Sequence, residues 1–150
     1  MILYLDDRLL HGRILRGWER KDSEGRTVLV SERLGDSLQL LFLEAAGETE
    51  LLFVNPLRDA VPEYQEGDFW LCDHPRILSL LQKAGRSPRQ MILIGLREKE
   101  GRRLSEDVCI SEESEVLMGQ AILDGVEVLL QSFPSLSPEP YPQKGENGLT

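Results

Sequence analysis

Short apolar runs alternate along the chain with segments whose apolar residues recur every three to four positions. A short continuous apolar run is typical of a strand buried on both faces, whereas a 3.6-residue period is typical of a helix that covers a sheet. Strands are expected at residues 2–5, 27–30, 50–54, 69–72, 91–94 and 126–131, with an extended segment at 104–110. Helices are expected at residues 13–20, 37–46, 56–64, 75–84 and 115–123.

Cap and turn residues mark the ends of several of these helices. The pair Asn55-Pro56 is typical of a helix start, with Asn as the cap and Pro in the first turn. Ser111 precedes a cluster of acidic residues, which suits a helix N-terminus and its dipole. Gly85 and Gly125 are expected to end the helices that precede them.

Strands that alternate with helices predict βαβ units. Right-handed crossovers then give a three-layer α/β/α sandwich, with a mostly parallel central sheet and helices on both faces. The carboxyl ends of parallel strands meet at one edge of the sheet, where ligands bind in such folds. That edge is expected to collect the loop after the first strand and the charged turn at residues 96–103.

The pattern stops near residue 133. Four of the eight prolines lie beyond it, at Pro134, Pro138, Pro140 and Pro142. We therefore expect one domain at residues 1–133 and a flexible, solvated tail at residues 134–150.

Composition narrows the class of protein. The chain is 41% hydrophobic and 29% charged, as in ordinary soluble globular proteins, and no apolar run reaches the length of a membrane span. Asp6 follows the first apolar run too early for a signal peptide. A net charge of −9 argues against nucleic-acid binding. Cys72 and Cys109 are expected to be free thiols in a reducing cytosol.

The segment after the first strand is the best candidate for chemistry. It runs Asp6-Asp7-Arg8, and His11-Gly12 follow after two intervening residues. The sequence holds no glycine-rich nucleotide motif, no zinc-ligand spacing and no serine-hydrolase elbow, so no cofactor or metal is expected.

Phosphoryl transfer through His11 fits these residues better. A neutral imidazole is a nucleophile at physiological pH, and the transfer otherwise needs positioned donors for the phosphoryl oxygens. Arg8 could supply a bidentate donor, and backbone N–H groups near Gly12 an anion-binding nest. Asp6 or Asp7 could hold one ring nitrogen. On the residues alone, a structural histidine is an open alternative.

The motif Asp6-Asp7-Arg8-Leu9-Leu10-His11-Gly12, with Trp18 following, resembles the D-D-R-L-I-H-G-Q signature of a known family. The family comprises the IIB components of the mannose/fructose/sorbose branch of the bacterial sugar phosphotransferase system (PTS). The resemblance implies that His11 carries phosphate, that Arg8 binds it, and that Asp6 and Asp7 are the family's acidic pair.

A role in sugar uptake follows from the same resemblance. The chain would be a cytoplasmic enzyme, a protein-histidine–sugar phosphotransferase. It would accept phosphate from a IIA phosphocarrier and pass it to a sugar held by membrane IIC and IID components, through which it would reach the membrane. A homodimer is compatible with this picture, and the sequence does not name the sugar.

Several positions differ from the family pattern. Tyr4 replaces the usual arginine, Arg13 the usual glutamine after H-G, and Leu96-Arg97 part of a common G-N-M loop. Arg13 is a further candidate phosphate-binding residue, and Arg97 belongs to a candidate mobile flap that contacts phosphate or partner.

Other functional hypotheses stay open. One is a divergent regulatory protein that senses PTS phosphorylation without transporting sugar, and another is a small-anion-binding domain in which His11 is only a donor. His74 is expected to be a helix-start residue rather than a catalyst. Ser31, at the end of the second strand, could donate to a phosphate.

Overall fold

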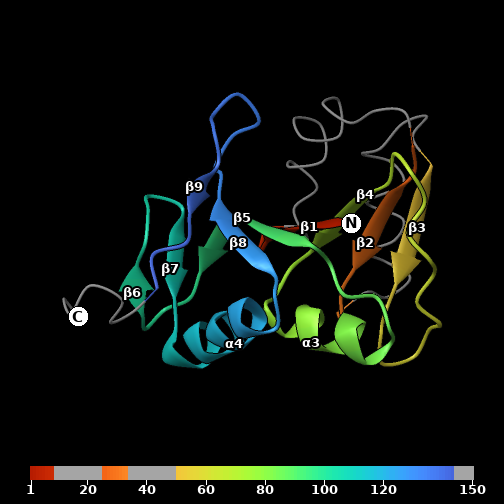
Figure 1. Cartoon of the computed structure of the whole chain (residues 1–150), viewed down its shortest axis with the longest axis horizontal. Coiled ribbons are helices and arrows are strands. Elements are labelled where there is room, and N and C mark those ends of the chain that lie inside the picture. The colour runs from red at the N-terminus through yellow and green to blue at the C-terminus, as the bar shows by residue number, and fades with distance from the viewer. Residues whose placement is uncertain (9–24, 34–49, 144–150) are drawn as a thin grey trace.

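A mostly parallel sheet organises the molecule (Figure 1). The computed structural model describes residues 1–8, 25–33 and 50–143. Their strands are β1 (Ile2–Asp6), β2 (Thr27–Val30), β3 (Leu51–Val54), β4 (Phe69–Cys72), β5 (Gln90–Arg97), β6 (Arg102–Arg103), β7 (Val108–Ile110), β8 (Glu127–Leu130) and β9 (Glu139–Pro140). The main path through the sheet runs β3-β2-β4-β1-β5-β7-β6.

Strand β5 has different partners along its length. Its first half pairs in parallel with β8, and its last residues, Leu96 and Arg97, pair in parallel with β7. The register between β1 and β5 shifts near their carboxyl ends, where Leu5 pairs with Leu93 but Asp6 pairs with Gly95. Only the β6–β7 and β8–β9 pairs are antiparallel among the described strands. The α/β class and the mostly parallel sheet predicted from the sequence are confirmed.

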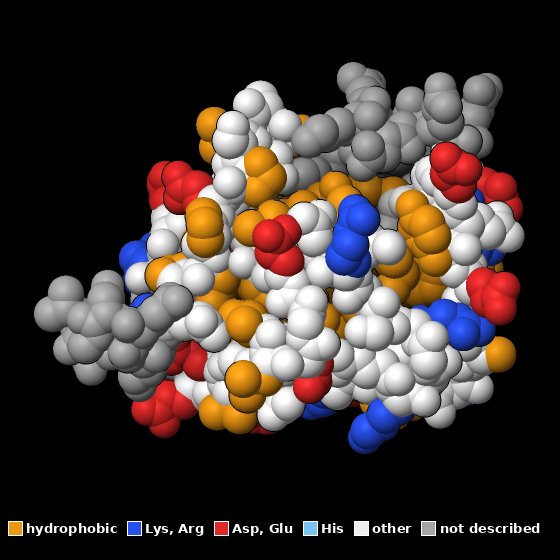
Figure 2. All heavy atoms as spheres, viewed as in Figure 1, with side chains coloured by type: hydrophobic (Ala, Val, Ile, Leu, Met, Phe, Trp, Pro, Cys, Tyr) orange, Lys and Arg blue, Asp and Glu red, His pale blue; other side chains and the backbone are white. Residues whose placement is uncertain are grey.

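Side chains of the parallel strands divide between two apolar clusters. One set, including Leu5 and Met91, packs with helices α3 (Arg76–Lys83) and α4 (Glu112–Leu123), which lie together on one face of the sheet (Figure 1). The alternate positions, including Tyr4, form a second buried cluster on the opposite face. Hydrophobic side chains also gather over the strands on the face seen in Figure 2. The helices predicted at residues 13–20 and 37–46 lie outside the described residues.

Both described helices end as their sequences predict. Gly85 and Gly125 have φ angles of 76° and 93°, which favour glycine. The N–H groups of Arg86 and Val126 donate back to the carbonyls of Leu81 and Ala121, as in the Schellman motif. The predicted cap at the start of α4 is confirmed, because Ser111 accepts a hydrogen bond from the Ser114 N–H.

The predicted helix at residues 56–64 is wrong. A single turn forms instead, in which the Asn55 carbonyl accepts from the N–H groups of Arg58 and Asp59. The Asn55 side chain caps this turn by accepting from the Leu57 N–H. The chain then continues without helix, because Pro62 disfavours helical geometry at the residue before it.

The extended segment and the charged turn also need correction. Strand β5 runs to Arg97, inside the predicted turn, and Arg102–Arg103 form β6. Within residues 104–110 only Val108–Ile110 form a strand, β7, which pairs with β6 as a hairpin. Gly101 permits this hairpin, because an added Cβ would lie 2.0 Å from the Ile110 carbonyl oxygen.

The solvated tail predicted from residue 134 is corrected over its first part. Residues Glu139–Pro140 form β9 against β8, and Tyr141 is buried in the core. The Arg102 guanidinium donates to the Pro142 carbonyl and so fastens the same segment. Burial raises the pKa of the Tyr141 hydroxyl to about 12, assisted by the nearby Glu115 carboxylate.

Two smaller expectations are also tested by the structure. Cys72 and Cys109 are free, as predicted, and burial raises the pKa of the Cys72 thiol. No helix among the described residues is long and apolar enough to cross a membrane.

Asp68, the residue before β4, joins three segments of the fold. Its carboxylate accepts hydrogen bonds from Arg26 Nε at 3.0 Å, from Trp70 Nε1 at 3.0 Å and from the Gln65 N–H at 2.9 Å. Burial alone would raise the pKa of Asp68, but these hydrogen bonds and the Arg26 charge lower it overall. The ionised carboxylate therefore stabilises the folded chain.

Replacing this carboxylate should destabilise the domain in a pH-dependent way. We expect Asp68→Asn to cost about 3 kcal/mol at pH 7, because it leaves the largely buried Arg26 charge without its partner. The unfolded chain binds the proton more readily than the folded chain, so the carboxylate's contribution is complete above the ordinary value of 3.8. The difference from wild type in urea unfolding should shrink as the pH falls below that value. Asp124→Asn, at an exposed helix end, is the control. A difference in unfolding free energy between Asp68→Asn and wild type that does not change with pH would contradict this account.

Candidate functional site

Polar residues follow three neighbouring strands at the carboxyl edge of the sheet. Asp6 ends β1, Ser31 follows β2 and Asp73 follows β4. Alternation along each strand puts their side chains on the face opposite α3 and α4, in line with Tyr4 and its cluster. All three are buried, at 0%, 0% and 8% exposure. The parallel pairing of β2, β4 and β1 thus brings these three polar side chains to one edge of the sheet.

The Asp6 carboxylate holds Arg8. Its Oδ1 accepts from the Arg8 backbone N–H at 2.8 Å and from Nε at 3.1 Å, and Oδ2 accepts from Nη2 at 2.9 Å. The hydrogen bond and charge of Asp6 raise the pKa of Arg8 above its ordinary value, against the effect of burial. Two of the five guanidinium N–H groups are used in this way. Nη1 has no contact within the described residues, and the side chain is 40% exposed.

Asp7 is tied to the neighbouring strand β5. Its N–H donates to the Gly95 carbonyl at 3.0 Å, and its carboxylate accepts from the Arg97 N–H and from Arg97 Nη1 at 3.1 Å. Arg97 Nη2 also contacts Asp107, at 3.2 Å. Arg97 is therefore the end of a strand with two carboxylate partners, whereas the sequence predicted it as part of a flap.

Gly95 gives these two ion pairs room to approach each other. A Cβ at this position would lie 3.2 Å from Asp6 Oδ1 and 3.0 Å from Arg97 Nη1. Since both distances are tight for a carbon atom, a larger residue would push one of the ion pairs aside. The register shift between β1 and β5 places Gly95 directly opposite Asp6.

Ser31 and Asp73 form a buried pair beside the Asp6–Arg8 ion pair. Ser31 Oγ donates to Asp73 Oδ2 at 2.7 Å and accepts from the Arg33 N–H at 3.0 Å. Burial raises the pKa of Asp73, although the Ser31 hydrogen bond opposes the shift. The Ser31 hydroxyl is therefore engaged within the protein, in place of the phosphate contact considered from the sequence.

His74 lies at the entry to helix α3, as expected, just before the cap residue Pro75. Its Nδ1 accepts from the Arg76 N–H at 3.0 Å, and its Nε2 lies 4.0 Å from Glu98. Arg76 makes a bidentate contact with Glu32 after β2, at 2.8 Å for both hydrogen bonds. This second arginine–carboxylate pair is at the same edge but has no contact with Asp6, Asp7 or Arg8 among the described residues.

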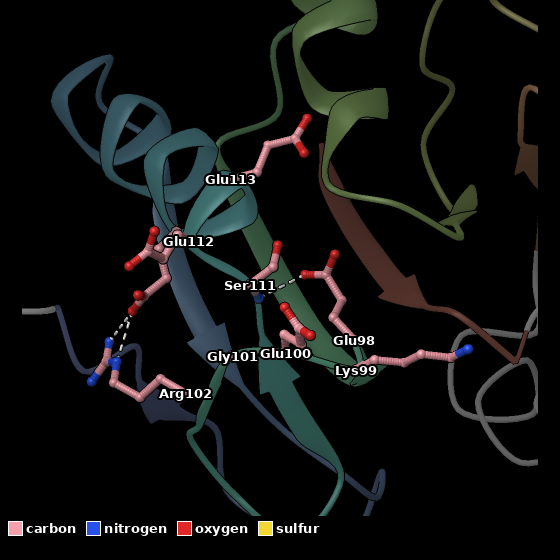
Figure 3. A pocket seen from close by; sticks show the side chains of 9 residues that line it. Glu98, Lys99, Glu100, Gly101, Arg102, Ser111, Glu112 and Glu113 are labelled. Atoms are coloured by element: carbon pink, nitrogen blue, oxygen red, sulfur yellow. Dashed lines mark hydrogen bonds and ion pairs between the residues drawn. The ribbon is translucent and has the colours of Figure 1, made fainter.

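An acidic hollow of about 890 Å³ lies next to this edge (Figure 3). Glu98 lines the hollow, and its carboxylate accepts a hydrogen bond from the Ser111 N–H at 3.1 Å (Figure 3). Arg102 also lines it and forms an ion pair with Glu115. Its lining residues are Glu98–Arg102, Ser111–Glu113 and Glu115. Five carboxylates against two cations would repel a phosphoryl group, so the hollow is not the anion site. No group of three metal-ligating residues occurs in residues 1–8, 25–33 and 50–143.

The structure brings together four of the predicted site residues, Asp6, Asp7, Arg8 and Arg97. His11, Gly12 and Arg13 lie outside the described residues, as does Trp18. Sequence reasoning missed Asp107 as a site residue, although it placed the residue in an extended segment. In the structure Asp107 lies in the loop between β6 and β7 and becomes a neighbour through the β5–β7 pairing.

Several solved structures share this fold. They include manxB from Thermoanaerobacter tengcongensis (18% identity, TM-score 0.81, covering 100% of this chain and 98% of that one). The IIB domain of the sorbose permease from Klebsiella pneumoniae matches at 18% identity and a TM-score of 0.75, over 93% of both chains. The N-acetylgalactosamine-specific IIB component 1 from Escherichia coli matches at 18% and 0.73, over 94% of this chain and 98% of that one.

These similarities show the fold, since each identity is below 25%. The chain has the α/β fold of PTS IIB components, as the sequence resemblance implied. No protein-family model matches the sequence, and no curated protein matches it.

Because Asp6 is buried, its ion pair with Arg8 should contribute more to stability than a partly exposed pair does. We expect Asp6→Asn to destabilise the protein by about 3 kcal/mol, because an amide offers one acceptor oxygen where Arg8 needs two. Glu32→Gln removes the same kind of bidentate contact where both side chains are partly exposed, so it should cost less than about 1 kcal/mol. Urea unfolding measures both. Equal losses would mean that burial does not set the strength of the Asp6–Arg8 pair.

Proposed function

We propose that this chain is a phosphocarrier IIB subunit of a mannose/sorbose-type PTS, with His11 as the transient phosphohistidine. It accepts phosphate from a IIA phosphohistidine and passes it to a sugar taken up by membrane IIC and IID components. The proposal combines the signature Asp6–Gly12, the IIB fold and the arrangement of Asp6, Asp7 and Arg8.

One observation carries the proposal. A buried carboxylate fixes Arg8 at the carboxyl end of the central strand β1, and the chain then leads directly to His11. Three peptide units separate Arg8 from His11, so their Cα atoms are at most about 11 Å apart. A fixed guanidinium close along the chain to the histidine supplies the kind of positioned donor that phosphoryl transfer needs.

The chemistry is a pair of in-line displacements. A ring nitrogen of His11 attacks phosphorus, the P–N bond to the IIA imidazole breaks, and that imidazole keeps the bonding pair. A sugar hydroxyl then attacks, loses its proton to a base, and the P–N bond to His11 breaks. Arg8 contributes by donating to phosphoryl oxygens through the N–H groups that Asp6 does not use.

His74 provides a matched control for the nucleophile, because the chain holds only two histidines. Incubation with phosphorylated IIA should label wild type and His74→Ala at an acid-labile, base-stable site, and should not label His11→Ala. Phosphate analysis by autoradiography and mass spectrometry checks the result. Labelling of His11→Ala at the wild-type level would refute the proposal.

Arg8 can be tested by a substitution that keeps its charge. We expect Arg8→Lys to lower the rate of phosphoryl transfer to His11 by about 100-fold, because an ammonium group cannot bind Asp6 bidentately and phosphate at once. Arg76→Lys alters a comparable bidentate pair at the same edge and should leave the rate unchanged. Quenched time courses of labelling with phosphorylated IIA measure the transfer rates of both variants. Similar rates for Arg8→Lys and wild type would exclude a role for the guanidinium.

A further inference from the structure

Arg97 links the Asp7–Arg8 turn to a hairpin far along the chain. Its Nη1 contacts Asp7 at 3.1 Å and its Nη2 contacts Asp107 at 3.2 Å. Asp107 lies in the loop between β6 and β7, and its carbonyl also accepts from the Leu96 N–H at 3.0 Å. Backbone and side chain thus both attach this loop to the end of β5.

Among the described residues, the Asp7 carboxylate is held by Arg97, through its backbone N–H and its Nη1. Asp6 is buried at the end of β1, but the Asp7 side chain is 26% exposed. Three hydrogen bonds connect Asp7 to residues 95–97, and two of them come from Arg97. Substituting Arg97 would remove the Nη1 contact and leave the Asp7 carboxylate, among the described residues, with one hydrogen bond, from the backbone N–H of residue 97.

We infer that Arg97 is a positioning residue, held by Asp107, that fixes the Asp7–Arg8 turn and thereby the orientation of the Arg8 guanidinium. Arg97 acts through Asp7 and does not itself contact phosphate. Its planar fork is needed because one nitrogen contacts Asp7 while another contacts Asp107, which a lysine ammonium cannot reproduce. The kinetic part of this inference rests on the proposed function.

Energetic and geometric effects of Arg97 should be separable. The Arg97 side chain is 41% exposed, and ion pairs of this kind add little to stability. A displaced donor, however, slows a reaction that depends on exact positioning. Substitution should therefore slow transfer while leaving the urea midpoint unchanged.

The test compares Arg97→Ala and Arg97→Lys with Arg76→Ala, which breaks an exposed arginine–carboxylate pair at the same edge. In both Arg97 variants we expect the Nε–Hε NMR signal of Arg8, identified by its loss in Arg8→Lys, to shift and broaden. We also expect kcat for phosphoryl acceptance to fall about tenfold or more, with KM for phosphorylated IIA unchanged. Asp107→Asn should act in the same direction, and Arg76→Ala should match wild type.

Two outcomes would overturn the inference. One is an unchanged Arg8 signal in Arg97→Ala, whatever the rate, since the turn would then be fixed without Arg97. The other is a wild-type rate in both Arg97 variants. If wild type itself accepts no phosphate, the proposed function fails, and the Arg8 signal alone decides whether Arg97 positions the turn.

Discussion

The site depends on one buried charge, the Asp6 carboxylate at the end of the central strand. A carboxylate removed from water without a partner would cost several kcal/mol, so the fold tolerates Asp6 only with its three hydrogen bonds from Arg8. The same pairing also holds Arg8, because its guanidinium cannot move away without leaving the buried Asp6 carboxylate unpaired. Arg8, in the turn after β1, thereby gains a fixed orientation from the core of the sheet.

The sheet topology brings distant carboxylates to this pair. Asp7 and Asp107 are a hundred residues apart in sequence, and both contact Arg97 because β5 pairs with β1 on one side and β7 on the other. The register shift that puts Gly95 opposite Asp6 provides the space for both ion pairs. A single strand end therefore couples the Asp7–Arg8 turn to the β6–β7 hairpin.

The sequence predicts the sheet and the edge of the site better than it predicts the connections. Continuous apolar runs such as Leu3–Leu5 fix the buried strands, and the Asp6–Arg8 turn follows directly from where β1 must end. The helix expected at residues 56–64 does not form. Asn55 caps a single turn, but Pro62 disfavours helical geometry in the residue before it. Tyr141 is missed because one aromatic residue between two prolines shows no period, although it packs into the core. Asp107 could not be found from local pattern, since only tertiary pairing makes it a neighbour of Arg97.

The electrostatic balance at this edge limits how phosphate can bind. Asp6, Asp7 and Asp107 oppose Arg8 and Arg97, so the five groups carry a net charge of −1 before a phosphoryl group arrives. Arg97 contacts two carboxylates, which balance its charge, whereas Arg8 contacts one and retains N–H groups that Asp6 does not use. Under the proposed function, Arg8 must therefore bridge the buried carboxylate and the phosphoryl oxygens. Under the same proposal, further donors would come from the segment after Arg8, where the sequence has Gly12 and Arg13; the glutamine usual in the family that the motif resembles would supply no charge.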